Sequence, residues 1–213
     1  NVEGETNLPF NLTKMSVIST ATAEPNEDAE NRWNLNLIQK NDFYFYIEKN
    51  PDYEKDISIS SITFDNFQIT KQPKIGTVNI YRPSETSILY HYTDNYLVDK
   101  SLKYNAALST NIAALEINNQ GGLIGFSIAL SNIGTYVSNE DVEIIHDGTL
   151  LNKNNISIED IKFEVSFDLI IETSNGSKFK STVTLDLPTG NIIEEGISSI
   201  EKKGIEDIIF KRM

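Results

Sequence analysis

The most regular alternation in this sequence occurs in Ile161-Lys-Phe-Glu-Val-Ser-Phe-Asp-Leu-Ile-Ile171 and in Lys178-Phe-Lys-Ser-Thr-Val-Thr-Leu-Asp-Leu187. Apolar residues at every second position are the pattern of a strand with one buried face. Ser174-Asn-Gly-Ser177 joins the two runs, and Asn-Gly in this place favours a type I′ turn, because that turn needs positive φ at both central residues. We therefore predict a β-hairpin over residues 161–187, ended by Pro188.

Similar runs occur upstream and downstream of this hairpin. Gln120-Gly-Gly-Leu-Ile-Gly-Phe-Ser-Ile-Ala-Leu130 predicts a strand that begins after a glycine turn or bulge. A second hairpin is predicted from residues 33–37 and 43–47, with the polar run Gln39-Lys-Asn-Asp42 as its turn. Further strands are predicted at 8–23, at 57–70 with a bulge between Ile59 and Ile62, and at 78–81, 88–92, 142–145, 197–200 and 205–210. Residues 94–105 are predicted to be a linker, and 108–117 a strand or a short helix.

Sustained helical periodicity is absent, so the fold class is predicted to be all-β. An acidic motif supports a duplication, because Asn26-Glu-Asp28 and Glu30 match Asn139-Glu-Asp141 and Glu143, and the same spacing brings Lys40-Asn41 onto Lys153-Asn154. A duplication predicts two tandem immunoglobulin-like β-sandwich domains, residues 1–100 and residues 101–213. If the similarity arose by chance, one larger β-sandwich is the alternative.

Composition excludes several classes of function. The chain has 213 residues and a net charge of −13, which argues against nucleic-acid binding and against docking on an anionic membrane surface. Cysteine is absent, which removes disulfides, cysteine-zinc sites and thiol catalysis. No apolar run approaches the roughly 20 residues of a membrane span, so no direct membrane insertion is expected in this segment. Residue 1 is Asn rather than Met, which leaves room for a removed signal peptide or an anchor upstream, and we expect an extracellular or cell-surface location.

No motif predicts catalysis. His91 lies in a predicted strand, and His146 precedes Asp147, a pair that needs a third group before it can act on a substrate. We expect no enzyme activity and no cofactor. A structural Ca²⁺ ion in the acidic loops Glu24–Glu30 and Asn139–Glu143 is an alternative, although neither loop has the spacing of an EF-hand.

Aromatic residues supply the candidate binding surface. Tyr44 and Tyr46 alternate with Phe43 and Phe45, so one of these pairs is expected to face outward. The candidate residues are Trp33, Tyr44, Tyr46, Tyr81, Tyr90 and Tyr92.

These observations predict a non-catalytic extracellular or cell-surface interaction or structural module, with a protein or a glycan as partner. The alternative is a carbohydrate-binding module or a weak glycan-active enzyme that uses exposed aromatics and the acidic loops. A row of coplanar exposed rings would favour that alternative, and buried tyrosines would argue against it. A third reading is a scaffold subunit that pairs through an exposed strand edge.

Overall fold

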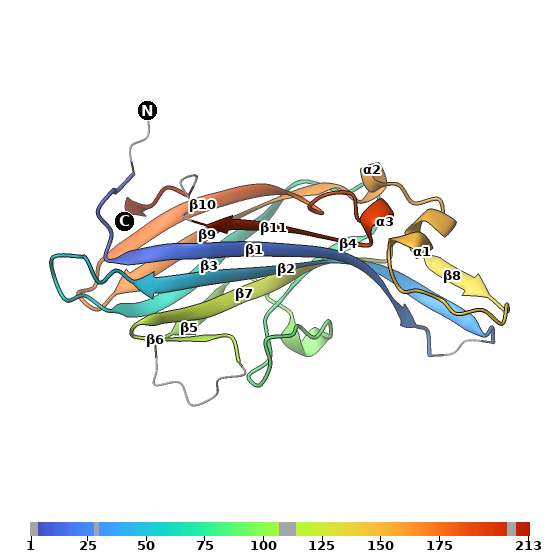
Figure 1. Ribbon diagram of the computed structural model, residues 1–213, viewed down its shortest axis with the longest axis horizontal. Helices are drawn as coiled ribbons and strands as arrows, with labels where there is room; N and C mark the ends of the chain where they lie inside the picture. The colour runs from blue at the N-terminus through green and yellow to red at the C-terminus, as the bar shows by residue number, and fades with distance from the viewer. Residues whose placement is uncertain (1–3, 28–29, 107–113, 204–207) are drawn as a thin grey trace.

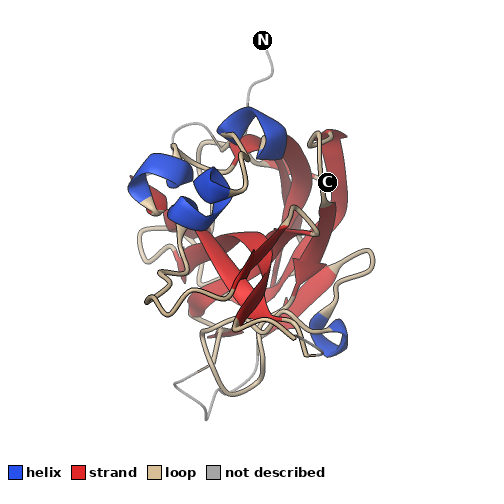
Figure 2. Ribbon diagram, turned by 90° about the vertical axis from the view of Figure 1, so that its right-hand side faces the viewer, coloured by secondary structure: helices blue, strands red, loops and turns tan. Residues whose placement is uncertain are grey.

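The structure is a computed structural model that describes residues 4–27, 30–106, 114–203 and 208–213. The chain is mostly β, with 53% of residues in strands and 9% in helices, and the strands form two antiparallel sheets. The sheets face each other across a shared interior (Figures 1 and 2). This confirms the all-β sandwich predicted from the sequence.

Sheet A contains seven strands in the order β11-β1-β2-β7-β4, with β6 also paired to β7 and β8 also paired to β2. Its strands are β1 (Phe10–Pro25), β2 (Trp33–Lys49), β4 (Thr77–Tyr81), β6 (Glu116–Asn118), β7 (Gly121–Ser131), β8 (Thr135–Ser138) and β11 (Ile197–Lys203). The long strands β1 and β2 run the length of the molecule (Figure 1).

Sheet B contains five strands in the order β12-β10-β9-β3-β5. They are β3 (Ile59–Lys71), β5 (Leu102–Asn105), β9 (Phe163–Thr173), β10 (Lys178–Leu187) and β12 (Lys211–Arg212). Three short helices, α1 (Gly148–Lys153), α2 (Ile158–Ile161) and α3 (Ile192–Glu195), gather at one end of the sandwich, and the 3₁₀-helix η1 spans Asp94–Tyr96 (Figure 1).

The hairpin predicted over residues 161–187 is confirmed, because β9 and β10 pair antiparallel along their whole length. The predicted type I′ turn is wrong. Gly176 has a φ of +82°, whereas no other residue between the two strands has a positive φ. The Gly176 N–H donates to the Thr173 carbonyl at 2.9 Å. The loop is therefore a three-residue connection in which a turn is followed by a left-handed glycine.

The second predicted hairpin is wrong, because residues 33–49 form one uninterrupted strand, β2. The polar residues that suggested a turn lie inside the sheet. Gln39 and Asn41 point into the core with no exposed surface, and their amide groups hydrogen-bond to each other at 2.8 and 2.9 Å. The run Gln39–Asp42 therefore continues the strand, because the tertiary structure satisfies its polar side chains.

The structure confirms one further prediction from the sequence and differs from several others. The bulge predicted between Ile59 and Ile62 is confirmed by a register shift between Ile59 and Ser61. Residues 88–92 and 142–145 do not form strands, and the predicted linker 94–105 contains η1 and β5. The predicted elements 108–117 and 205–210 lie partly outside the described residues, with β6 at the end of the first.

Each sheet contains strands from both halves of the chain. In sheet A, β2 pairs with β7, and in sheet B, β3 pairs with β9, so residues 1–100 and residues 101–213 each contribute to both sheets. The matched motifs also differ in structure, since Lys40-Asn41 lies in β2 whereas Lys153-Asn154 lies at the end of α1. The division into two tandem domains stays a prediction.

The core lies between the inward faces of the two sheets and is centred on phenylalanine rings. The ring of Phe126 in β7 lies 4.7 Å from that of Phe43 in β2, 4.9 Å from that of Phe64 in β3 and 5.0 Å from that of Phe167 in β9 (centroid distances). All four side chains are fully buried. The same rings therefore join sheet A to sheet B.

Candidate binding surface

A long connection between β4 and β5, residues 82–101, crosses the outer face of sheet A, which is the face turned away from sheet B. We call this segment the strap; it is drawn in green below β7 in Figure 1. Its last part lies along β4, where the Arg82 N–H donates to the Tyr96 carbonyl and the Val98 N–H donates to the Ile80 carbonyl, both at 2.8 Å. The strap therefore covers the outer edge of β4.

Tyrosine hydroxyls fasten the strap to β2. Tyr90 donates to the backbone carbonyl of Phe43 at 2.8 Å, and Tyr44 donates from the sheet to the Ile88 carbonyl at 3.2 Å. Gly125 makes room for this contact, because a Cβ atom at that position would lie 2.5 Å from the Tyr90 hydroxyl and 1.9 Å from the Phe43 carbonyl oxygen. Any larger residue there would displace the strap or the strand.

Asp42 lies under the strap and accepts two short hydrogen bonds. Tyr92 donates to its carboxylate at 2.5 Å and Ser127 donates to it at 2.6 Å. The Lys40 ammonium lies 3.9 Å from the centroid of the Tyr92 ring. Burial raises the pKa of Asp42, and the two hydroxyl donors and Lys40 oppose that rise. Burial also lowers the pKa of Lys40.

The raised pKa makes stability depend on pH. The unfolding free energy contributed by Asp42 should fall as the pH rises from about 4, the usual aspartate pKa, to its higher pKa in the fold, because only the folded state keeps the proton there. Asp42→Asn removes this titration. The stability of the variant relative to wild type should therefore rise across that window, by about 1.4 kcal/mol for each unit that separates the two pKa values, and stay constant above it.

Urea denaturation of both proteins between about pH 4 and about pH 8 measures this difference, in which the titration of all other carboxylates cancels. A relative stability of the variant that falls with rising pH would show that the donors Tyr92 and Ser127 outweigh burial.

Beside the strap, the outer face of sheet A carries an open recess of about 510 Å³, which we call the groove. Its residues come from β1, β2, β7 and the strap: Lys14, Ser16, Ile18, Tyr44, Tyr46, Ile88 and Leu123. Several of its apolar side chains reach solvent, with exposed fractions of 38% for Tyr46, 45% for Ile88 and 37% for Leu123. The groove is therefore a largely apolar surface that nothing in the described chain covers.

The structure separates the six aromatic residues predicted as a binding surface. Tyr44 and Tyr46 line the groove, which agrees with the expectation that one pair of the Phe43–Tyr46 run faces outward. Tyr81, the last residue of β4, and Tyr90, in the strap, are buried, and Tyr92 donates a hydrogen bond to Asp42. Their rings are not coplanar, since the planes of Tyr44 and Tyr90 differ by 43° and those of Tyr81 and Tyr92 by 72°. A flat stacking platform for a sugar is therefore not formed by these side chains.

Trp33, the sixth candidate, is the first residue of β2 and contacts the second acidic loop. Its indole N–H donates to the Glu140 carbonyl at 3.2 Å, and the neighbouring Arg32 forms a 2.6 Å ion pair with Asp141. Within the described residues, no group of three or more His, Cys, Asp or Glu side chains could hold a metal ion. Asp28, which belongs to the first of the proposed Ca²⁺ loops, lies outside the described residues.

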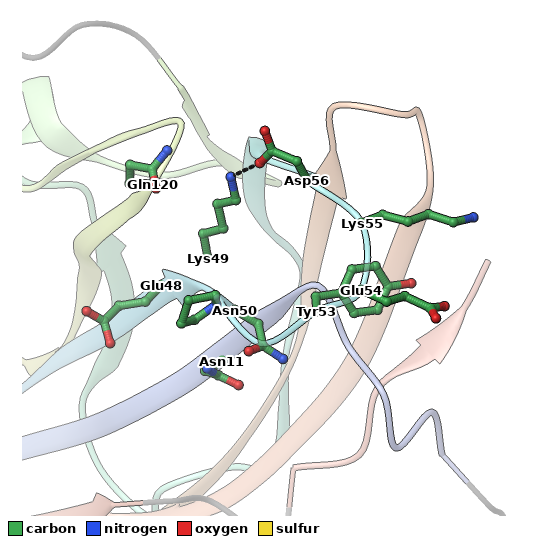
Figure 3. Close-up of a pocket in the computed structure, with 10 residues that line it drawn as sticks. Asn11, Glu48, Lys49, Asn50, Tyr53, Glu54, Lys55, Asp56 and Gln120 are labelled. Atoms are coloured by element: carbon green, nitrogen blue, oxygen red, sulfur yellow. Dashed lines mark hydrogen bonds and ion pairs between the residues drawn. The ribbon is translucent and has the colours of Figure 1, made fainter.

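Sequence reasoning did not find a second recess, of about 540 Å³, at the end of the sandwich (Figure 3). It is lined mainly by the connection between β2 and β3, and Lys49 forms an ion pair with Asp56 there (Figure 3). Among the described residues, the side chains of Tyr53 and Gln120 make no hydrogen bond in this pocket. These groups remain available to a polar ligand.

The two histidines lie in different surroundings. The His91 ring packs against Tyr96 in the strap with centroids 5.4 Å apart, whereas His146 is exposed just before α1. Asp147 caps α1 by accepting a hydrogen bond from the Thr149 N–H at 2.9 Å.

None of the helices in the described part of the chain is long and apolar enough to cross a membrane. Comparison with protein families, with curated proteins and with solved structures found no match for this chain.

Proposed function

We propose that the chain is a non-catalytic interaction module that binds another protein through the outer face of sheet A. The observation that carries this proposal is the groove, a recess of about 510 Å³ with the apolar side chains of Tyr44, Tyr46, Ile88 and Leu123 around it. A contiguous exposed apolar patch marks a protein or membrane interaction site or a ligand-binding groove. The groove has no cluster of polar groups such as an enzyme uses to hold a reacting atom.

The construction of the groove supports binding without rearrangement. Tyr44 and Tyr46 project from β2 and Leu123 from β7, both interior strands of sheet A. Ile88 belongs to the strap, whose position is fixed by the hydroxyls of Tyr44 and Tyr90. A recess that exists before the partner arrives costs less ordering entropy on binding.

The edge-pairing alternative is narrowed to fewer strands. In sheet A the outer side of β4 is occupied by the strap, which leaves β11 at the other end of the strand order. The immunoglobulin-like label and the extracellular or cell-surface location stay predictions, and protease treatment of intact cells that express the chain would test the location.

A site-specific photocrosslinker tests the groove in cells that express the chain. Placed at Ile88 or Leu123, the crosslinker should give one discrete protein adduct, because both side chains are partly exposed in the groove. The adduct should disappear when Ser16→Phe fills the recess. At Thr182, on the outer face of sheet B, the same crosslinker should give no adduct and serves as the matched control.

Equal adducts from Thr182 and Ile88 would contradict the proposal. Binding of a soluble glycan that is lost on Tyr53→Ala but kept on Ser16→Phe would instead favour the carbohydrate alternative at the pocket of Figure 3.

A further inference from the structure

A third recess, of about 460 Å³, lies on the outer face of sheet A, near the end at which the short helices gather (Figure 1). Thr20 and Thr22 of β1 and Lys40 of β2 line it from the sheet. Its other wall comes from the segment before α1 and from the junction of α3 with β11. We call it the lysine recess, because Lys40 has the only amino group among the described residues that line it. It shares no residue with the groove and is therefore a separate site.

The Lys40 side chain has no ionic partner. Lys40 lies opposite Thr20 of β1 and Ala129 of β7 in the strand registers, so its cross-strand neighbours are uncharged. Within the described part of the chain, its ammonium forms no hydrogen bond and no ion pair, and it contacts the face of the Tyr92 ring. An aromatic ring does not compete for the lone pair of a neutral amine. Ion pairs occupy the ammonium groups of Lys14, Lys49, Lys71 and Lys162.

Partial burial favours the neutral form of this amine. Lys40 is half-buried, and burial lowers its pKa, whereas the carboxylates of Glu24 and Asp42 oppose that change. The other titratable groups that line the recess are His146, Asp147 and Glu195. Carboxylates therefore lie around the amine on both β-strands and on the opposite wall, which disfavours an anionic ligand. The lysine recess suits an uncharged reactant.

We propose that Lys40 is a site of reversible imine formation with small neutral aldehydes that enter the lysine recess. The nitrogen lone pair adds to the carbonyl carbon, and the proton that nitrogen releases passes to the carbonyl oxygen. The resulting carbinolamine loses one water molecule as the C=N double bond forms, and water reverses the step. No oxidant or reductant takes part. Lysines that form imines in proteins are those whose ammonium is desolvated, and Lys40 meets that condition while still facing an open recess.

Reductive trapping tests this assignment. The chain is treated at about pH 7 with limiting propanal and cyanoborohydride, which converts each imine into a stable secondary amine, and peptide mapping by mass spectrometry gives the rate at each lysine. Lys40 should react about fivefold faster than Lys153, or more, because a larger share of its amine is neutral. Lys153 is the matched control, since its ammonium also lies over a tyrosine ring, 5.4 Å from the centroid of Tyr136, while its side chain is exposed.

The pH dependence of trapping separates proton loss from simple accessibility. The rate at Lys40 should reach its plateau below the usual lysine pKa of about 10.4. Without the reductant, the propanal adduct of Lys40 should disappear on dialysis. An adduct that persists would show that the product is not an imine and would overturn the proposal.

One variant tests the electrostatics without changing Lys40. Glu24→Gln removes a carboxylate that stabilises the ammonium, so it should raise the rate at Lys40 several-fold and leave Lys153 unchanged. Glu54→Gln, an equally exposed change in the connection between β2 and β3, should alter neither rate and is its matched control.

Two results would overturn the proposal. A rate at Lys40 no higher than that at Lys153 would show that the recess does not activate the amine. An equal rise at both lysines in Glu24→Gln would show that the variant loosens the fold rather than changing the charge of Lys40. Neither result bears on the groove, so the proposed function is tested separately.

Discussion

Phe126→Ala should lower the unfolding free energy by about 3–5 kcal/mol, the largest loss that we expect from one substitution in this protein. The ring is fully buried in β7 and lies within 5.0 Å of the rings of Phe43, Phe64 and Phe167, measured between centroids. These neighbours belong to both sheets, so the cavity left by alanine would open at the contact between them. A rigid sandwich interior closes such a cavity poorly, which places the cost in the upper part of the usual range.

Leu123→Ala in the same strand provides the control. Leu123 faces the groove and is 37% exposed, so its truncation should cost less than about 1 kcal/mol. Chemical denaturation of both variants and of the wild type gives the comparison. Losses of similar size in the two variants would show that the rings around Phe126 do not form the centre of the core.

The features predicted correctly are those in which one face of a strand meets a uniform environment. In β9, Phe163, Val165 and Phe167 are buried and the residues between them are not, so the period of two is visible in the sequence itself. The same period of two separates Phe43 and Phe45, which are buried, from Tyr44 and Tyr46, as expected of a run in which one pair faces outward. Local alternation was sufficient in both places.

The features that sequence reasoning missed depend on contacts between distant residues. The strap is fixed to sheet A by the Tyr90 hydroxyl on the Phe43 carbonyl and by the Tyr92 hydroxyl on Asp42, across 47 and 50 residues of sequence. Nothing in residues 88–92 alone distinguishes tyrosines that dock on another strand from tyrosines that alternate within their own strand. The groove was missed for the same reason, since Ile88 reaches it only when the strap is in place.

The run Gln39–Asp42 shows how a buried network can imitate a turn. Gln39 and Asn41 project into the core, where Ser19 of β1 donates to the Asn41 amide oxygen at 2.7 Å. The backbone N–H of Thr189, which follows β10, donates in turn to the Ser19 hydroxyl at 2.9 Å. The network therefore links β1 and β2 of sheet A to the segment that leaves sheet B.

Asn41→Leu should lower the unfolding free energy by about 2–4 kcal/mol. The Gln39 amide and the Ser19 hydroxyl would stay buried and lose a partner, at about 1–3 kcal/mol each, and the leucine side chain would recover part of this by apolar burial. Gln39→Leu combined with Asn41→Leu should be more stable than Asn41→Leu alone, because removing both amides leaves fewer unsatisfied groups. Urea denaturation of the two single variants, the double variant and the wild type forms a double-mutant cycle. The cycle gives the coupling energy between Gln39 and Asn41.

The sign of the coupling shows what the amide pair does for the fold. Additive losses would mean that Gln39 and Asn41 stabilise the protein independently, contrary to the 2.8 and 2.9 Å hydrogen bonds between them. A double variant that regains stability but gives broadened amide resonances along β1 and β2 would assign the network a different role. Apolar residues on a long strand tolerate a slip in pairing, whereas an amide pair bonded to Ser19 and to the Ile128 carbonyl fits one register. The network would then select the register of sheet A, and with it the alignment of Ser16 and Tyr44, which both line the groove.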